Sequence, residues 1–146
     1  MVDPDTEELP FYGLYNVKEQ NGFSSYVISD KIYDMVAEAE RQDGIIRNSL
    51  AHDPLDQAEM NIKSADLYVI WDDLLNALWA EVKNSLSEDG FQALLEEQRS
   101  WIAEKEKAVE EAGEEFAGGT MQHMVMNLKA ADLTKERVYE LYELLK

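Results

Sequence analysis

The chain has 146 residues, and its 31 acidic side chains against 13 lysines and arginines give a formal net charge of -18 at pH 7. A field of this sign repels nucleic acids and anionic membrane surfaces, so neither is an expected partner. The absence of cysteine excludes disulfides, thiol catalysis and zinc–thiolate sites, and no run approaches the roughly 20 apolar residues that a membrane-spanning helix needs.

Residues 1–28 differ in composition from the rest of the chain, because five aromatic side chains gather there: Phe11, Tyr12, Tyr15, Phe23 and Tyr26. Asn21-Gly22 separates two partly alternating runs, which is the strongest short signal for a β-hairpin. A lone hairpin is marginal in water, so this one would have to lean on a helical body. The alternative is an extended arm that uses its aromatic side chains as anchors.

The hydrophobic period becomes helical at about Ser29, and residues 29–146 are predicted to form one helical domain. Ser29 or Asp30 is a candidate cap for a first helix that runs to about Gln42. Asp43-Gly44 is a turn signal, so we expect it to break or kink this helix before a shorter apolar segment.

A long second helix is predicted to begin with Asp53 as its N-cap and Pro54 in its first turn, and to end near Leu86. Its apolar side chains recur at three- and four-residue spacing, which places one stripe on one side of the helix. The stripe consists of Ala65, Tyr68, Asp72, Leu75, Trp79, Val82 and Leu86.

A Ser-Glu-Asp-Gly turn precedes a third predicted helix from about Phe91 to Phe116, and Gly118-Gly119 ends it. The buried side of this helix is expected to hold Phe91, Leu94 or Leu95, Gln98, Trp101 or Ile102, Lys105 and Val109. A final helical segment follows, and Thr134 is a candidate cap for its last turns. Helices of this length joined by short turns pack antiparallel. The predicted fold is therefore all-α, an antiparallel up-and-down bundle with an N-terminal extension.

Methionines mark the start of the last segment. A methionine-rich helix face is either an adaptable binding surface or part of a core. We expect Met121 and Met124 to belong to the core.

The sequence offers little for catalysis. A di-iron bundle needs Glu-x-x-His pairs, but Ser49 and Thr120 stand three residues before the two histidines. No phosphate-binding glycine loop or nucleophile elbow is present. We therefore expect no catalytic residue, no metal and no cofactor.

Asp72 carries a charge on a stripe of the second helix that should be buried. A buried carboxylate is costly unless it is paired, and arginine can grip both of its oxygens. We predict that Asp72 pairs with Arg99 or Arg137 and that Asn61 or Asn76 completes a network that holds the helices in register.

Short motifs then follow one another along the chain: Gln57-Ala58-Glu59-Met60-Asn61, Asp72, Leu75-Asn76, Gln98-Arg99-Ser100-Trp101-Ile102, Gly118-Gly119-Thr120, Leu133-Thr134 and Arg137. In this order and spacing they resemble the LprI-type lysozyme inhibitors over about residues 52–142. The resemblance implies a small helical bacterial protein, secreted or lipid-anchored, and some members of the family are implicated in inhibiting lysozyme. The lack of catalytic motifs leads us to expect that the protein is not an enzyme. Members often carry cysteines that bridge the helices, which this chain lacks.

Nine positions are carried over from the resemblance, and we expect them to support the fold more than to contact a ligand: Asn61, Asp72, Asn76, Gln98, Arg99, Trp101, Gly118, Gly119 and Arg137. The opening MVDPDTEELP lacks the basic and apolar regions of a signal peptide. It is therefore expected to be either a natural start or the start of a chain whose leader has been removed.

Three functions remain open. The first is an extracytoplasmic protein that sterically blocks a lysozyme-like glycosidase, toward which acidic charge would steer it if the enzyme is basic. Loops often carry function, so the turn at residues 87–90 and the joint at Gly118-Gly119 are candidate contacts. The second is a cell-envelope interaction module with another protein or peptide ligand, bound through the aromatic residues of 11–26. The third and weakest is a hydrolase with paired carboxylates.

Overall fold

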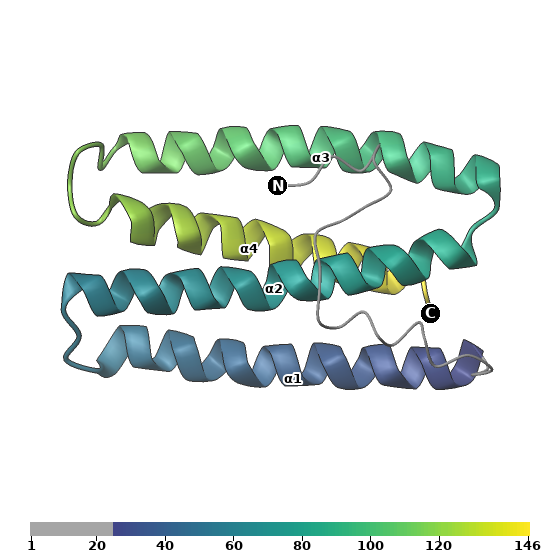
Figure 1. Ribbon diagram of the computed structural model, residues 1–146, viewed down its shortest axis with the longest axis horizontal. Helices are drawn as coiled ribbons and strands as arrows, with labels where there is room; N and C mark the ends of the chain where they lie inside the picture. Colours follow the sequence, from purple (N-terminus) through teal and green to yellow (C-terminus); the bar gives the residue numbers. More distant parts are fainter. Residues whose placement is uncertain (1–24) are drawn as a thin grey trace.

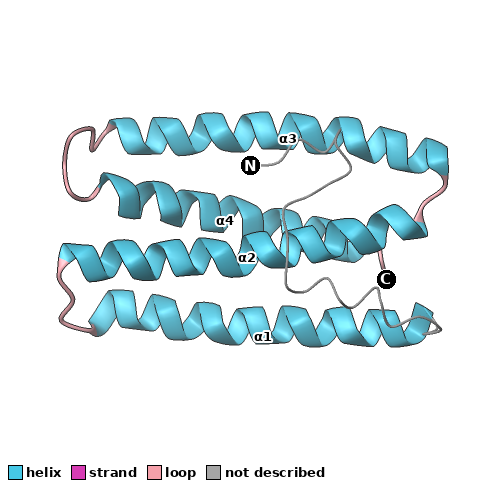
Figure 2. Ribbon diagram, viewed as in Figure 1, coloured by secondary structure: helices cyan, strands magenta, loops and turns pink. Residues whose placement is uncertain are grey.

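The computed structural model describes residues 25–146, and these form four helices with no strand in that range (Figures 1 and 2). Helix α1 spans Ser25–His52, α2 spans Gln57–Ser85, α3 spans Glu88–Glu114 and α4 spans Gln122–Glu143. Successive helices run in opposite directions, so the predicted all-α up-and-down bundle is confirmed. The predicted hairpin at Asn21-Gly22 lies outside the described residues.

Helices α2 and α4 form the centre of the bundle. They run parallel to each other, with α3 packed on α4 and α1 packed on α2 (Figure 1). Their shared core includes side chains with almost no solvent exposure, which are Leu67, Trp71, Leu74, Leu78, Val138 and Leu141. Because the two central helices supply most of this core, each outer helix needs to bury only one stripe.

Helix α1 continues through Asp43-Gly44, so the predicted break or kink is wrong. The Asp43 side chain is 5% exposed and accepts hydrogen bonds from Trp71 Nε1 at 2.8 Å and Arg47 Nε at 2.9 Å. Gly44 lies on the open side of the helix. Glycine within a helix costs about 1 kcal/mol relative to alanine, and the buried contacts of its neighbour outweigh that local preference.

The cap of α2 is Asp56, three residues after the predicted Asp53. The Asp56 side chain accepts a hydrogen bond from the Glu59 backbone nitrogen at 2.8 Å, and the Glu59 carboxylate accepts one from the Asp56 nitrogen at 3.1 Å. This reciprocal arrangement is a capping box, which satisfies two backbone donors at once. Asp53 instead accepts a hydrogen bond from the Ser49 hydroxyl at 2.7 Å.

Helix α4 is unbroken, and Thr134 is fully buried in its middle, so the predicted cap at Thr134 is wrong. The expectation that Met121 and Met124 belong to the core is wrong, because neither is among the side chains that form it or pack against it. Met124 is half-buried, and Met121 is 41% exposed at the start of the helix.

The capping box generates a stability prediction. Asp56→Ala removes the side-chain acceptor, so we expect the free energy of unfolding to fall by about 1 kcal/mol. Asp56→Ser keeps an oxygen in the same place and should stay within a few tenths of a kcal/mol of the parent, on the order of other good caps. Urea denaturation of the three proteins measures both values, and equal losses in the two variants would contradict the cap.

Candidate functional site

The nine motif positions fall into two groups along the bundle. Six of them form what we call the polar layer, in the middle of α2, α3 and α4: Asp72, Asn76, Gln98, Arg99, Trp101 and Arg137. The other three, Asn61, Gly118 and Gly119, stand where α1 turns into α2 and α3 turns into α4. We call this end of the bundle, residues 53–62 and 110–124, the loop end.

Arg137 is the centre of the polar layer. Its side chain is 4% exposed, and its Nε donates a hydrogen bond to Gln98 Oε1 at 2.7 Å. Its Nη1 donates to Glu97 and Glu140, each at 2.8 Å, and its Cζ lies 6.0 Å from the centroid of the Trp101 ring. The buried charge is therefore balanced by two carboxylates that reach in from the surface, and the pairing ties α4 to α3.

The interior of the same three helices is incompletely hydrogen-bonded. Within the described part of the chain, three buried side-chain nitrogen and oxygen atoms on α2 and α4 have no hydrogen-bond partner: Asn76 Nδ2, Thr134 Oγ1 and Arg137 Nη2. An unpaired buried polar group costs about 1–3 kcal/mol. The polar groups here therefore stabilise the bundle less than apolar side chains of the same size would.

Asp72 has different partners from those predicted, so its expected pairing with Arg99 or Arg137 is wrong. The half-buried Asp72 carboxylate accepts a hydrogen bond from the Tyr68 hydroxyl and interacts electrostatically with Lys105. Lys105 Nζ, on α3, donates to the Tyr68 hydroxyl oxygen at 2.7 Å. Tyr68 thus bridges the lysine and the carboxylate, and Lys105 links α3 to α2 at this level.

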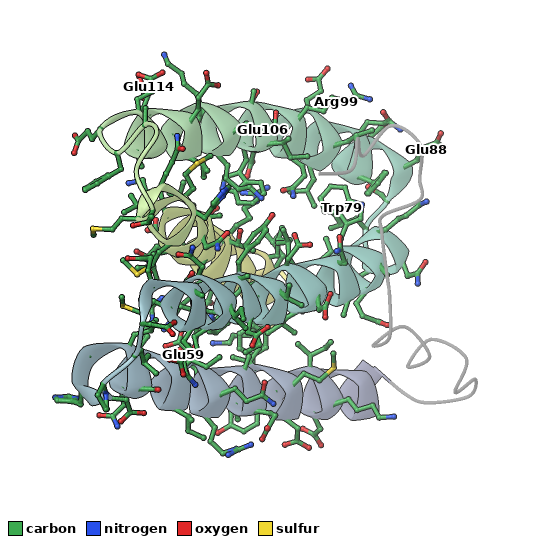
Figure 3. The ribbon with its side chains drawn as sticks, turned by 60° about the vertical axis from the view of Figure 1, so that its left-hand side comes forward. Glu59, Trp79, Glu88, Arg99, Glu106 and Glu114 are labelled. Carbon is green, nitrogen blue, oxygen red and sulfur yellow. The ribbon has the colours of Figure 1, made fainter. Side chains whose placement is uncertain are left out.

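The remaining predicted members of that network lie elsewhere. Arg99 is exposed on the outer face of α3 (Figure 3). Asn76 is buried but makes no hydrogen bond to Asp72, and Asn61 lies two turns or more away at the loop end. Sequence reasoning placed Lys105 on the buried stripe but did not assign it to Asp72.

Burial shifts the pKa values of Lys105 and Asp72. Desolvation lowers the pKa of Lys105 to about 8, against the opposing influence of Asp72 and Glu106. The Lys105 Nζ lies 4.8 Å from the centroid of the Tyr68 ring and 5.2 Å from that of Trp101. Burial also raises the pKa of Asp72, although Lys105 and Tyr68 partly offset the effect. Both charged forms are therefore disfavoured by their surroundings.

At the loop end, Asn61 fastens α2 to the connection between α3 and α4. Its Nδ2 donates to the Thr120 carbonyl oxygen at 3.5 Å, and its Oδ1 accepts from Gln57 Nε2 at 2.9 Å. Asn127 Nδ2, on α4, donates to the Asn61 carbonyl oxygen at 3.4 Å. Gly118 has a φ of 80°, a backbone conformation that glycine adopts without strain. These hydrogen bonds fix the connection between α3 and α4 against the start of α2.

Sequence reasoning missed one glycine that shapes the loop end. A Cβ atom at Gly113 would lie 2.6 Å from both Cγ and Sδ of Met126, so glycine lets α3 and α4 approach closely. The available signal was a glycine inside a helical pattern, which often has a packing reason. At Gly119, a Cβ would lie 3.3 Å from the Phe116 carbonyl oxygen, so that position is also tight.

The surface of the loop end combines one sign of charge with exposed apolar side chains. It contains no lysine or arginine, and its acidic residues are all exposed: Asp53, Asp56, Glu59, Glu110, Glu111, Glu114 and Glu115. Figure 3 shows Glu59 on α2 and Glu114 on α3 at this same end of the bundle. Ile62 and Met121 are exposed beside these residues.

Among residues 25–146, no cluster of histidine and carboxylate side chains has the makings of a metal site. None of the four helices is both long and apolar enough to span a membrane.

The Arg137 contacts predict a specific pattern of stability. Arg137→Met leaves the buried Gln98 amide oxygen unpaired, so we expect a loss of about 1–3 kcal/mol of unfolding free energy. The double variant Arg137→Met/Gln98→Leu removes both buried polar partners and should recover most of that loss. Lys107→Met, on the exposed face of α3, should change stability by no more than about 0.5 kcal/mol. Chemical denaturation measures the free energy of unfolding of all three variants. A double variant that is less stable than Arg137→Met would contradict the pairing of Arg137 with Gln98.

The lowered pKa of Lys105 predicts a pH dependence. Between about pH 8, its folded value, and its ordinary value of 10.5, the unfolded chain holds a proton that the folded protein has lost. Stability contributed by this site should therefore rise with pH in that window. Relative to Lys105→Met, which carries the same tyrosines, the parent should gain about 1–2 kcal/mol between pH 7.5 and 9.5. Denaturation curves of both proteins test this, and a constant difference across the window would refute it.

Comparison with known proteins adds the family. A family model described as lysozyme inhibitor LprI matches residues 51–141, which contain α2, α3, most of α4 and all nine motif positions. No curated protein and no solved structure matched the chain. Because the family model covers more than half of the sequence, the chain belongs to the LprI lysozyme inhibitor family.

Proposed function

We propose that this protein acts outside the cytoplasm, where it binds a basic lysozyme and blocks the entry of polysaccharide into the enzyme's cleft. The observation that carries the proposal is membership of the LprI lysozyme inhibitor family over three of the four helices. The charge of the chain supports it, since -18 is complementary to a basic glycosidase.

A binding role also fits the chemistry of the described side chains better than catalysis does. The carboxyl group whose pKa is raised between α2 and α3, Asp72, is engaged by Tyr68 and Lys105 of the bundle itself. The family is one of inhibitors, and membership therefore argues against a hydrolase with paired carboxylates. The acids outside the polar layer lie mainly on exposed faces, where they can meet a cationic partner.

Rigidity supports steric inhibition. The helices that match the family are joined by a short turn between α2 and α3 and by a hydrogen-bonded connection between α3 and α4. A preorganised surface loses little conformational entropy when it binds, so more of the contact energy is available for affinity. A rigid body that covers the cleft excludes a long polysaccharide without contacting the catalytic carboxylates of the enzyme.

The envelope module with another ligand is the alternative. The aromatic residues of 11–26 on which it depends lie mostly outside the described residues, so no contact in the bundle favours it over inhibition.

The test is inhibition of a basic C-type lysozyme that hydrolyses a soluble, neutral chitin oligosaccharide. We expect saturable, competitive inhibition by the full chain that persists in 0.15 M salt, with faster association at low salt because opposite charges steer the encounter. A neutral substrate is needed because an anionic cell wall would compete for the same basic surface.

The control is an unrelated acidic protein of comparable size and net charge. Equal inhibition by this control, or inhibition that vanishes at 0.15 M salt, would mean that the chain binds lysozyme only through non-specific charge attraction. Either result would contradict the proposed function. Tight binding without inhibition would contradict blockage of the cleft and favour the envelope module.

A further inference from the structure

Few large apolar side chains are exposed on the part of the chain that the structure describes. Among the described residues, the large hydrophobic side chains that face solvent are Tyr33, Ile45, Ile62, Val69, Met121 and Leu144. Ile62 and Met121 directly follow Asn61 and Thr120, which are joined by a hydrogen bond. The two side chains therefore share the loop end although 59 positions separate them in the sequence.

The charged side chains within the loop end are all acidic, although Lys63, half-buried on α2, follows Ile62 directly. Every charged side chain of the loop end is an exposed aspartate or glutamate, and these come from the α1–α2 turn, the start of α2 and the end of α3. An apolar centre with a polar rim is the usual anatomy of a protein interface. The sign of this rim selects a partner that presents lysine and arginine around an apolar or aromatic depression.

The opposite end of the bundle also exposes two large apolar side chains, Tyr33 and Leu144, but it differs in its charge and in the connection between its helices. Its connection between α2 and α3 consists only of Leu86 and Ser87, so it projects little beyond the helices. Lysines mix with the acids there, because Lys31, Lys83 and Lys146 lie near the helix ends that meet at this side (Figure 1). The turn at residues 87–90, one of the two candidate contacts from the sequence, is therefore the weaker of the pair.

The loop end is also fixed in place by contacts from several helices. Besides the bond from Asn61 to Thr120, Gln122 Nε2 donates to the Gly113 carbonyl oxygen at 3.3 Å. Gln57 Nε2 lies 3.9 Å from Met124 Sδ. These contacts hold the connection that carries Met121 against both α2 and α3, so the exposed side chains are presented without a prior ordering step.

We infer that the loop end is the surface that docks on the lysozyme, with Ile62 and Met121 covering the mouth of the sugar-binding cleft and the acidic rim meeting the enzyme's cationic surface. This inference rests on the proposed function, and it names the contact surface that the function requires. The occupant is the cleft face of a basic glycosidase, selected by charge complementarity. A few well-packed residues near the centre of such a contact carry most of the binding energy.

Two matched double variants test the apolar centre. Ile62→Asp/Met121→Asp places charges in the centre of the proposed contact, and Tyr33→Asp/Leu144→Asp makes the same change at exposed positions of the other end. Both variants add two negative charges, so long-range steering changes equally. We expect the first to raise the inhibition constant against the basic lysozyme about tenfold or more and the second to leave it within about twofold, as substitutions outside a contact do.

A second pair of variants tests the rim. Glu114→Lys/Glu115→Lys reverses two charges at the loop end, and Glu96→Lys/Glu104→Lys reverses two exposed charges in the middle of α3. Net charge is identical in both, so only position differs. The loop-end variant should show the larger loss in association rate and the weaker salt dependence. Circular dichroism and thermal melting confirm that all four proteins are folded.

The outcomes separate the surface from the function. If the parent inhibits and the two loop-end variants lose inhibition while their controls keep it, the inference stands. If the parent inhibits and the loop-end variants inhibit as well as it does, the docking surface is wrong and the proposed function survives. If the parent neither binds nor inhibits the lysozyme, both the function and the surface assigned to it are overturned.

Discussion

The position of α3 depends on how a single buried guanidinium is neutralised. Helix α3 reaches the rest of the bundle mainly through α4, and Arg137 joins the two by its bonds to Gln98 and Glu97. A charge buried to this degree is tolerated only when hydrogen-bonded carboxylates or amides surround it. Successive helical residues lie about 100° apart around the axis. A shift of α3 by one residue in register would therefore place a neighbour of Gln98 opposite Arg137 and leave the arginine without this hydrogen bond. The same pairing therefore sets where the end of α3, with its acidic residues, emerges at the loop end.

Hydrophobic spacing predicted the helices because it records directly which side of each helix is buried, and Trp79 and Val82 are buried as that spacing requires. The hydrogen-bond and ion-pair partners of the buried polar side chains could not be predicted from hydrophobic spacing. Asp72 was placed on the correct side of α2, but whether Lys105 or an arginine faces it depends on the rotation and level of α3, which no local pattern encodes. At Asp43 a local turn signal was overridden by Trp71, a partner 28 positions away. The cap of α2 was predictable, because Asp56 has a glutamate three residues later and Asp53 does not.

Helix α1 lies almost wholly outside the region that matches the family, yet it is integrated with α2 and α4. Lys135 on α4 pairs with Glu40 at 3.0 Å and Asp43 at 3.7 Å, and Tyr139 also donates to Glu40. A bond from Arg47 to Asp132 at 2.7 Å adds a further link. Trp71 is fully buried beneath these contacts, and its indole nitrogen is satisfied by Asp43. In a chain without cysteine, specific polar contacts between helices provide the register that a disulfide would otherwise help to fix, although each exposed pair adds little stability.

Most of the motif positions contact other parts of the bundle, as is expected of residues that support the fold. Asp72, Gln98, Trp101 and Arg137 contact other side chains of the bundle, and Asn61 and Gly118 shape a connection. The side chains that face solvent beside these positions, Ile62 and Met121, are not themselves part of any motif. Shared motif residues can thus fix the position of a contact surface in the fold. The residues between the motifs then determine the charge and polarity of that surface. In this chain those residues are acidic around an apolar centre, which is why charge and exposure, rather than the motifs, point to the kind of partner that fits.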